Sequence, residues 1–158
     1  MAHLNEELIA RFYAAFANRQ GEVMAACYAP DARFSDPVFT DLIGREPGDM
    51  WRMLTGRAKD LEVRLAEYEA NERRGSAHWL ADYTFSTGRR VHNDVRAEFT
   101  FDDGLIALHT DRFSFYGWAR QALGPVGLAL GWTPMVRGKV QREARAGLDA
   151  FIAAAPPT

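Results

Sequence analysis

The residues best suited to acid–base chemistry are one histidine and two aspartates. His109 and Asp111 stand two residues apart in the extended run from Leu105 to Tyr116. A strand places both side chains on one face, with their bases about 6.5 to 7 Å apart. The pair can share a hydrogen bond or flank one ligand. The alternative is an exposed pair that bonds to Arg112 and Arg120.

The second aspartate stands in a short extended piece with apolar neighbours. Asp36 lies between Phe34 and Pro37, so an apolar cavity nearby would partly remove its carboxylate from water. Desolvation raises the pKa of a carboxyl group and makes the carboxylate a better base. Asp-Pro is also common in turns, so Asp36 as a cap on the turn into Pro37 is the alternative.

An asparagine falls on the apolar face of another predicted strand. Asn93 shares this face with Val95 and Ala97 in the run from Val91 to Phe101. A buried amide needs hydrogen-bond partners. Asn93 therefore either orients a ligand or sits at a sheet edge where the backbone satisfies it.

Other chemistries find little support in the sequence. His3, His78, His92 and His109 lack the spacing of metal ligands. Cys27 stands in an apolar run and is better explained as a buried, unreactive thiol than as a nucleophile. No phosphate-binding glycine loop and no Gly-X-Ser-X-Gly motif occurs. We therefore expect neither a metal nor a cofactor.

Length and charge limit the class of protein. The chain has 158 residues, of which 47% are hydrophobic and 25% charged, as expected for a single globular domain spanning residues 1–158. A net charge of -2 gives no reason to expect nucleic-acid binding. The N-terminus lacks the features of a secretory signal and no apolar stretch is long enough to span a bilayer, so we expect a cytoplasmic protein.

The hydrophobic pattern changes period along the chain. Helical spacing predicts helices over 5–17, 23–28 and 47–56. Alternation then predicts strands over 61–71, 78–86, 91–101 and 105–116, and Asp102-Asp103-Gly104 predicts a hairpin turn between the last two. Helices followed by an antiparallel meander indicate an α+β fold, with the helices packed on one face of a curved sheet.

The amino-acid composition changes after Gly117. Residues 122–132 are apolar and rich in Gly, and residues 136–152 form a predicted amphipathic helix with basic residues on its outer side. We interpret the 122–132 segment as a lid over a cavity mouth or as packing at a dimer interface. Contact of this segment with a membrane surface is the less favoured alternative.

Two motifs support a family resemblance over residues 5–116. The first motif is the run Tyr28-Ala29-Pro30-Asp31-Ala32-Arg33-Phe34-Ser35-Asp36-Pro37. The second precedes the last strand and is Phe101-Asp102-Asp103-Gly104-Leu105-Ile106. With the order of elements, they make the chain resemble the nuclear transport factor 2-like superfamily, which includes SnoaL-like cyclases, ketosteroid isomerases and limonene epoxide hydrolases. The resemblance implies a cone-shaped, curved antiparallel sheet with the N-terminal helices on its concave face. Residues 1–116 would form this core, and residues 117–158 a C-terminal helical extension without a counterpart.

The resemblance also implies a pocket for a hydrophobic small molecule. Asp36 falls at the position of the isomerase general base, with Asp111 and His109 as a partner acid or orienting pair. A protonated His109 would keep Asp36 ionised. Tyr13 and Asn93 are candidate hydrogen-bond donors. The remaining candidates form the walls of the pocket: Trp79, Tyr83, Phe99, Phe113 and Trp118.

The chain departs from two known patterns. The isomerase oxyanion donors would fall at Phe12 and Ala97, which cannot donate. The Arg-X-Asp of limonene epoxide hydrolases is not matched either, although Asp111 is placed to activate water. We therefore expect a cofactor-independent isomerase, cyclase or hydrolase acting on a hydrophobic substrate by carboxylate chemistry. The alternative is a non-catalytic ligand-binding or protein-interaction domain of the same fold.

A homodimer is expected from the sheet. Apolar side chains occupy both faces of the strand around Tyr83, and a one-layer sheet with two partly apolar faces needs cover on both. The helices would cover one face, and a partner copy or the C-terminal segment the other.

Overall fold

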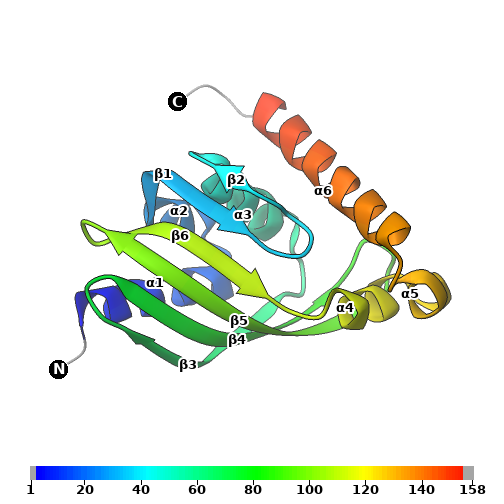
Figure 1. Cartoon of the computed structure of the whole chain (residues 1–158), viewed down its shortest axis with the longest axis horizontal. Helices are drawn as coiled ribbons and strands as arrows, with labels where there is room; N and C mark the ends of the chain where they lie inside the picture. Colours follow the sequence, from blue (N-terminus) through cyan, green and yellow to red (C-terminus); the bar gives the residue numbers. More distant parts are fainter. Residues whose placement is uncertain (1–2, 155–158) are drawn as a thin grey trace.

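A six-stranded, strongly curved sheet forms the body of the protein (Figure 1). The computed structural model describes residues 3–154. The strands are β1 (Tyr28–Ser35), β2 (Leu42–Ile43), β3 (Glu62–Ala70), β4 (Arg74–Thr84), β5 (Arg90–Asp102) and β6 (Leu105–Arg112). The helices are α1 (Leu4–Ala17), α2 (Gly21–Ala26), α3 (Glu46–Arg57), α4 (Phe115–Ala122), α5 (Pro125–Leu130) and α6 (Pro134–Ala154).

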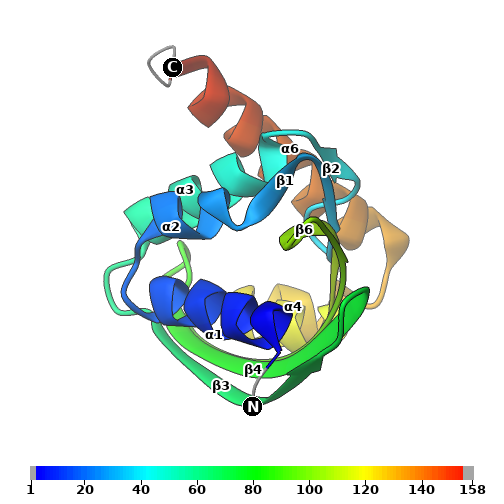
Figure 2. The same ribbon diagram turned by 90° about the vertical axis from the view of Figure 1, so that its left-hand side faces the viewer.

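The sheet confirms the predicted meander and adds two strands to it. The strand order is β2-β1-β6-β5-β4-β3, and β3 to β6 pair antiparallel. Asp103 and Gly104, with φ of 49° and 75°, form the predicted hairpin turn. β1 pairs with β6 in parallel, and four strands, β2 to β5, lie between them in the sequence. The sheet curls around α1, as Figure 2 shows, so the helices lie on its concave face.

The last strand is shorter than the alternation predicts, and this part of the prediction is wrong. β6 ends at Arg112 rather than at Tyr116. The Ser114 hydroxyl accepts a hydrogen bond from the Gly117 amide at 3.0 Å and so caps α4, which begins at Phe115. A helix cap therefore ends the extended run, and Phe113 and Phe115 do not continue the face of the strand.

The core between the sheet and α1–α3 is largely aromatic. Phe12, Phe16, Trp51 and Trp79 are buried there, and their rings contact one another at centroid distances from 4.8 to 5.8 Å. Aromatic pairs of this kind add to the stability that comes from burial alone. This cluster anchors α1 and α3 to the concave face of the sheet.

The C-terminal helices close one end of this body. α4 packs on β5, and α6 crosses α3, where Leu148 is fully buried. Gln141 donates to the Pro37 carbonyl at 3.1 Å, which ties α6 to the turn after β1. The predicted single segment 122–132 is divided by Gly124, whose φ of 65° separates α4 from α5. No helix within residues 3–154 combines the length and the apolar character that crossing a membrane requires.

Candidate functional site

A chain of buried hydrogen bonds runs from α3 to β6. Trp51 Nε1 donates to Tyr28 Oη at 2.8 Å, Tyr28 Oη lies 2.7 Å from His109 Nδ1, and His109 Nε2 lies 2.8 Å from Asp111 Oδ1. An indole N–H can only donate, so the Tyr28 hydroxyl accepts a hydrogen bond from Trp51. We assign its own O–H as the donor to His109 Nδ1. His109 Nε2 then carries the hydrogen and donates it to the Asp111 carboxylate. Every donor in this chain has an acceptor.

His109 is enclosed by aromatic rings. The rings of Phe34 and Phe99 lie 4.9 and 4.4 Å from the imidazole, and the side chain is fully buried. The enclosed imidazole holds the Asp111 carboxylate in place through its hydrogen bond. His109 and Asp111 therefore share a hydrogen bond, which is one of the two arrangements expected from the sequence. Arg112 instead pairs with Glu98 on the opposite face of the sheet.

Asp36 lies at the end of β1, where its carboxylate caps a turn. Oδ1 accepts the backbone N–H groups of Val38 at 2.7 Å and Phe39 at 2.6 Å. Desolvation raises the pKa of Asp36 to about 7, against the lowering effect of the Phe39 amide. The negative charge of Asp111 raises this pKa further. Asp36 therefore caps the turn, as one of the two interpretations predicts, and desolvation holds its pKa near neutral pH.

Two buried tyrosines have raised pKa values. Burial raises the pKa of Tyr83, and the charge of Asp36 adds to this effect. Burial also raises the pKa of Tyr13 well above its ordinary value, and here the charge of Asp111 adds to the effect. The Tyr83 hydroxyl accepts a hydrogen bond from Trp118 Nε1 at 2.9 Å. This bond joins β4 to α4.

Two buried donors in this region have no acceptor. Among residues 3–154, neither the Tyr13 hydroxyl nor the Trp79 indole N–H has a hydrogen-bond partner. The two rings are neighbours, with centroids 5.8 Å apart. Asn93 of β5 is also a buried polar residue. Buried polar groups are almost always satisfied, so unpaired donors mark a place for an acceptor that this chain does not itself supply.

The polar groups lie where two apolar clusters meet. The larger cluster fills the space between the sheet and α1–α3, and the smaller one surrounds Trp118 of α4. Val38, Tyr83 and Phe113 pack against both clusters. The Asp36 carboxylate accepts a hydrogen bond from the Val38 amide, and its charge raises the pKa of Tyr83. Its carboxyl therefore lies at this junction.

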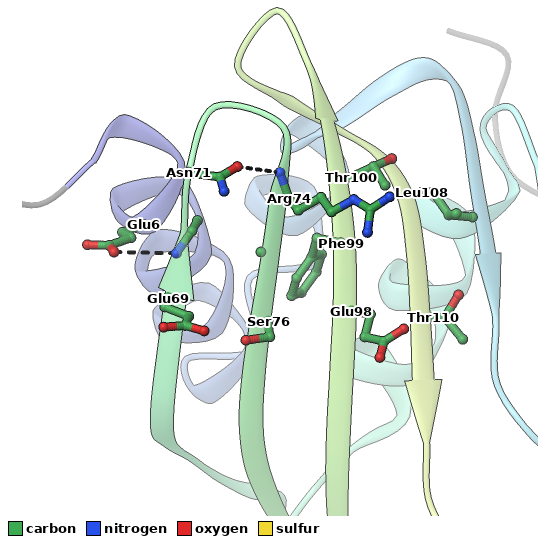
Figure 3. A pocket seen from close by; sticks show the side chains of 12 residues that line it. Glu6, Glu69, Asn71, Arg74, Ser76, Glu98, Phe99, Thr100, Leu108 and Thr110 are labelled. Carbon is green, nitrogen blue, oxygen red and sulfur yellow. Dashed lines mark hydrogen bonds between the residues drawn. The ribbon is translucent and has the colours of Figure 1, made fainter.

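The hollows on the molecular surface lie elsewhere. One, of about 740 Å³, lies on the outer side of β3–β6 and reaches Glu6 of α1 at one edge (Figure 3). It is crossed by a row of paired polar residues: Glu69, Ser76, Glu98 and Thr110. No three His, Cys, Asp or Glu side chains of the described chain are grouped as a metal site.

The structure brings most of the predicted site residues together but changes the role of some. Phe99 packs on His109 deep in the core, and Phe113 lies at the junction. His109 is not the partner of Asp36, because Tyr28 and Asp111 occupy its two nitrogens. The sequence analysis missed Tyr28 and Trp51 as members of the polar chain. Tyr28 begins the family motif, but only the fold shows that its hydroxyl meets β6.

Comparison with known proteins places this chain in a family. The sequence profile of the SnoaL-like domain matches residues 9–109, more than half of the chain. The protein therefore belongs to the SnoaL-like domain family, within the nuclear transport factor 2-like class that the curved sheet and its helices define. No curated protein matches the chain.

Solved structures agree on the fold. An NTF2-like protein of unknown function from Burkholderia pseudomallei K96243 shares 17% identity over 76% of this chain and 98% of its own, with a TM-score of 0.66. An LEH-like epoxide hydrolase from M. tuberculosis shares 23% identity over 80% and 96%, with a TM-score of 0.65. A protein of ketosteroid isomerase-like fold from Catenulispora acidiphila DSM 44928, in complex with trimethylamine, shares 16% identity over 81% and 98%, with a TM-score of 0.65.

Proposed function

We propose that the junction between the two apolar clusters is a site for cofactor-independent acid–base chemistry on a hydrophobic small molecule. Asp36 is the base, and the Asp111 carboxylate, oriented by His109, holds a water molecule. Tyr13 and Asn93 donate hydrogen bonds to a substrate oxygen, with Trp79 as a further donor. Apolar walls come from the aromatic side chains of the junction and the adjacent core: Tyr83, Phe99, Phe113 and Trp118.

The observation that carries this proposal is the state of the Asp36 carboxyl. Its pKa of about 7 lies close to neutral pH, where a general base works best. Its Oδ1 is held by two backbone amides, and Oδ2 forms no hydrogen bond within residues 3–154. The unpaired donors of Tyr13 and Trp79 supply what an oxygen that gains negative charge would need. Isomerases, cyclases and epoxide hydrolases all need a base of this kind and hydrogen-bond donors of this kind.

The test measures proton transfer on two apolar probes. The first is exchange of the α-protons of 2-tetralone into D₂O, followed by NMR, and the second is hydration of styrene oxide. We expect the protein to accelerate at least one reaction and Asp36→Asn to reduce that rate about 10²-fold or more. The matched control is Asp31→Asn, an exposed aspartate of the same strand, which should leave the rate unchanged.

The alternative function is a non-catalytic ligand-binding or interaction domain. The close ring contacts of the aromatic core favour it, since they leave less room for a large substrate. A protein that accelerates neither probe reaction, or an undiminished rate in Asp36→Asn, would support this alternative and contradict acid–base chemistry at Asp36.

We also propose that the protein forms a homodimer through the sheet face opposite α1. This face carries the hollow of Figure 3, the exposed Leu108 and the Arg112–Glu98 ion pair, which are features that a second copy can complement. The C-terminal helices cover α3 and one end of the sheet, so this face lacks other cover within residues 3–154. Light scattering at micromolar concentration should give twice the 17.7 kDa mass of one chain, and the mass of a monomer would contradict the proposal.

A further inference from the structure

Exposed apolar side chains are concentrated at one place on the molecule. Of the ten large apolar residues that are exposed in the described chain, five fall within residues 126–135. Their exposed fractions are Val126 56%, Leu128 60%, Leu130 42%, Trp132 71% and Met135 69%. Scattered exposed apolar residues are ordinary, but a contiguous group marks a contact surface. We call these five residues the apolar knob.

The backbone of α5 holds the knob in a fixed, convex shape. Gly127 is the only buried residue of α5, and a Cβ added there would overlap the carbonyl of Ala119. α5 therefore packs on α4 through its bare backbone and turns its side chains outward. The Tyr116 hydroxyl donates to the Leu128 carbonyl at 2.9 Å, which fastens the knob to α4. Figure 1 shows α5 at one end of the molecule, away from α1 and the middle of the sheet.

The sequence segment that carries the knob is basic. Residues 113–142 contain no Asp or Glu, although the whole chain has 21 acidic residues and a net charge of -2. The same segment contains four basic residues, all exposed: Arg120, Arg137, Lys139 and Arg142. They stand on α4 and on the first half of α6, the two helices that flank α5 (Figure 1).

We propose that the apolar knob docks on a lipid bilayer with anionic headgroups. Leu128 and Trp132 enter the interfacial layer, where tryptophan is favoured because its ring is apolar and its N–H is polar. The four basic side chains face the anionic headgroups, which attract Lys and Arg near the surface. Binding to a surface needs no helix that crosses the membrane, and it does not depend on the proposed chemistry at Asp36.

The exposure of the knob decides between the interpretations of residues 122–132. A lid would be buried over the site, but that position is taken by α4, whose Trp118 bonds to Tyr83. A protein partner is the remaining alternative. The exposed basic residues of the flanking helices suit the anionic headgroups of a bilayer, although Lys139 also pairs with Glu143 at 4.0 Å. We therefore take the membrane surface, which the sequence analysis placed second, as the occupant to test.

The first experiment is sedimentation with large vesicles, using the full chain. We expect the protein to pellet with vesicles of three parts phosphatidylcholine to one part phosphatidylglycerol. Binding to vesicles of phosphatidylcholine alone should be at least about tenfold weaker because the charge attraction is absent. Binding to the anionic vesicles in 0.5 M NaCl should fall by a similar factor because the attraction is screened. Leu128→Ser with Trp132→Ser should reduce the partition coefficient at least about tenfold.

The matched control changes two exposed apolar residues elsewhere. Leu4→Ser with Ile43→Ser removes side chains that are 77% and 50% exposed, and its partition coefficient should stay within about twofold of the wild type. All four side chains are exposed, so both double variants should keep the wild-type melting temperature within about 2 °C.

A second readout places the tryptophan in the lipid. Three of the four tryptophans, Trp51, Trp79 and Trp118, are buried, so quenching by lipids with brominated acyl chains reports on Trp132. We expect quenching in the wild type and its loss in Trp132→Ser. Failure to bind anionic vesicles, or binding that Leu128→Ser with Trp132→Ser leaves unchanged, would overturn the proposal. A halved solution mass in that variant without vesicle binding would assign the knob to a second copy instead.

Discussion

The interior of this protein contains two clusters of polar side chains, which differ in whether their hydrogen bonds are satisfied. We call them the deep group and the second group. In the deep group, Trp51, Tyr28, His109 and Asp111 satisfy one another in a continuous series of hydrogen bonds. In the second group, among residues 3–154, Tyr13 and Trp79 have donors without acceptors and Asp36 Oδ2 forms no hydrogen bond. Both groups are enclosed by aromatic residues, so burial does not explain the difference.

The difference separates stability from function. A satisfied network in a low-dielectric core fixes one arrangement of its side chains and contributes to stability. An unsatisfied buried donor costs free energy in the unliganded protein, and this cost is recovered when a ligand supplies the acceptor. Under the proposed function, the deep group supports Asp111 and the second group contacts the ligand. Each prediction below tests that division.

The largest effect on stability is expected at the centre of the deep group. His109→Leu leaves the buried Asp111 carboxylate and the Tyr28 hydroxyl without their partner, and should reduce the free energy of unfolding by about 3–5 kcal/mol. The control is His78→Leu, which breaks a hydrogen bond to Asp94 on the outer face and should cost within about 1 kcal/mol. Urea denaturation measures both. Equal losses would mean that the deep group is no more important than a surface pair.

A smaller effect is expected from the pH dependence of stability. The pKa of Asp36 is raised from 3.8 to about 7 in the folded protein, so the folded state holds this proton more tightly than the unfolded state. The contribution of Asp36 to stability is therefore full below about pH 4 and is lost as the pH rises from about 4 to 7. Asp36→Asn should remove this loss, of about 1–3 kcal/mol after allowance for partial exposure, while it keeps the acceptor of the turn.

The measurement is the free energy of unfolding at pH 5 and at pH 8, with Asp31→Asn as the control. Asp36→Asn should be the more stable protein at pH 8 and should change less between the two pH values than the wild type. Parallel pH profiles for the wild type and Asp36→Asn would show that Asp36 titrates as an ordinary exposed carboxyl.

Much of the fold follows from local patterns in the sequence, but the polar chain does not. The period change near residue 61 and the Asp103-Gly104 turn identify the meander, because these signals arise within a few neighbouring residues. The end of β6 was missed because the Ser114 cap competes with an alternating pattern that continues to Tyr116. Tyr28 and His109 are 81 residues apart and meet only through the parallel pairing of β1 with β6, which no local pattern encodes.

The candidate site shows the same limit. The sequence indicates Asp36 and Asp111 by residue type and by their place in the family motif. It cannot show that the Tyr13 hydroxyl lacks an acceptor while that of Tyr28 has both partners, since this depends on atoms from α1, α3 and β6.

The most direct test of the division is the same substitution at two buried tyrosines, compared by the free energy of unfolding of the unliganded protein. Tyr28→Phe removes a hydroxyl with two hydrogen bonds and should destabilise the protein by about 1–3 kcal/mol, because Trp51 and His109 lose their partner. Tyr13→Phe removes a hydroxyl with none and should be neutral within about 0.5 kcal/mol or stabilising. Equal destabilisation by the two changes would show that Tyr13 is satisfied in the free protein, and would contradict its assignment to the ligand.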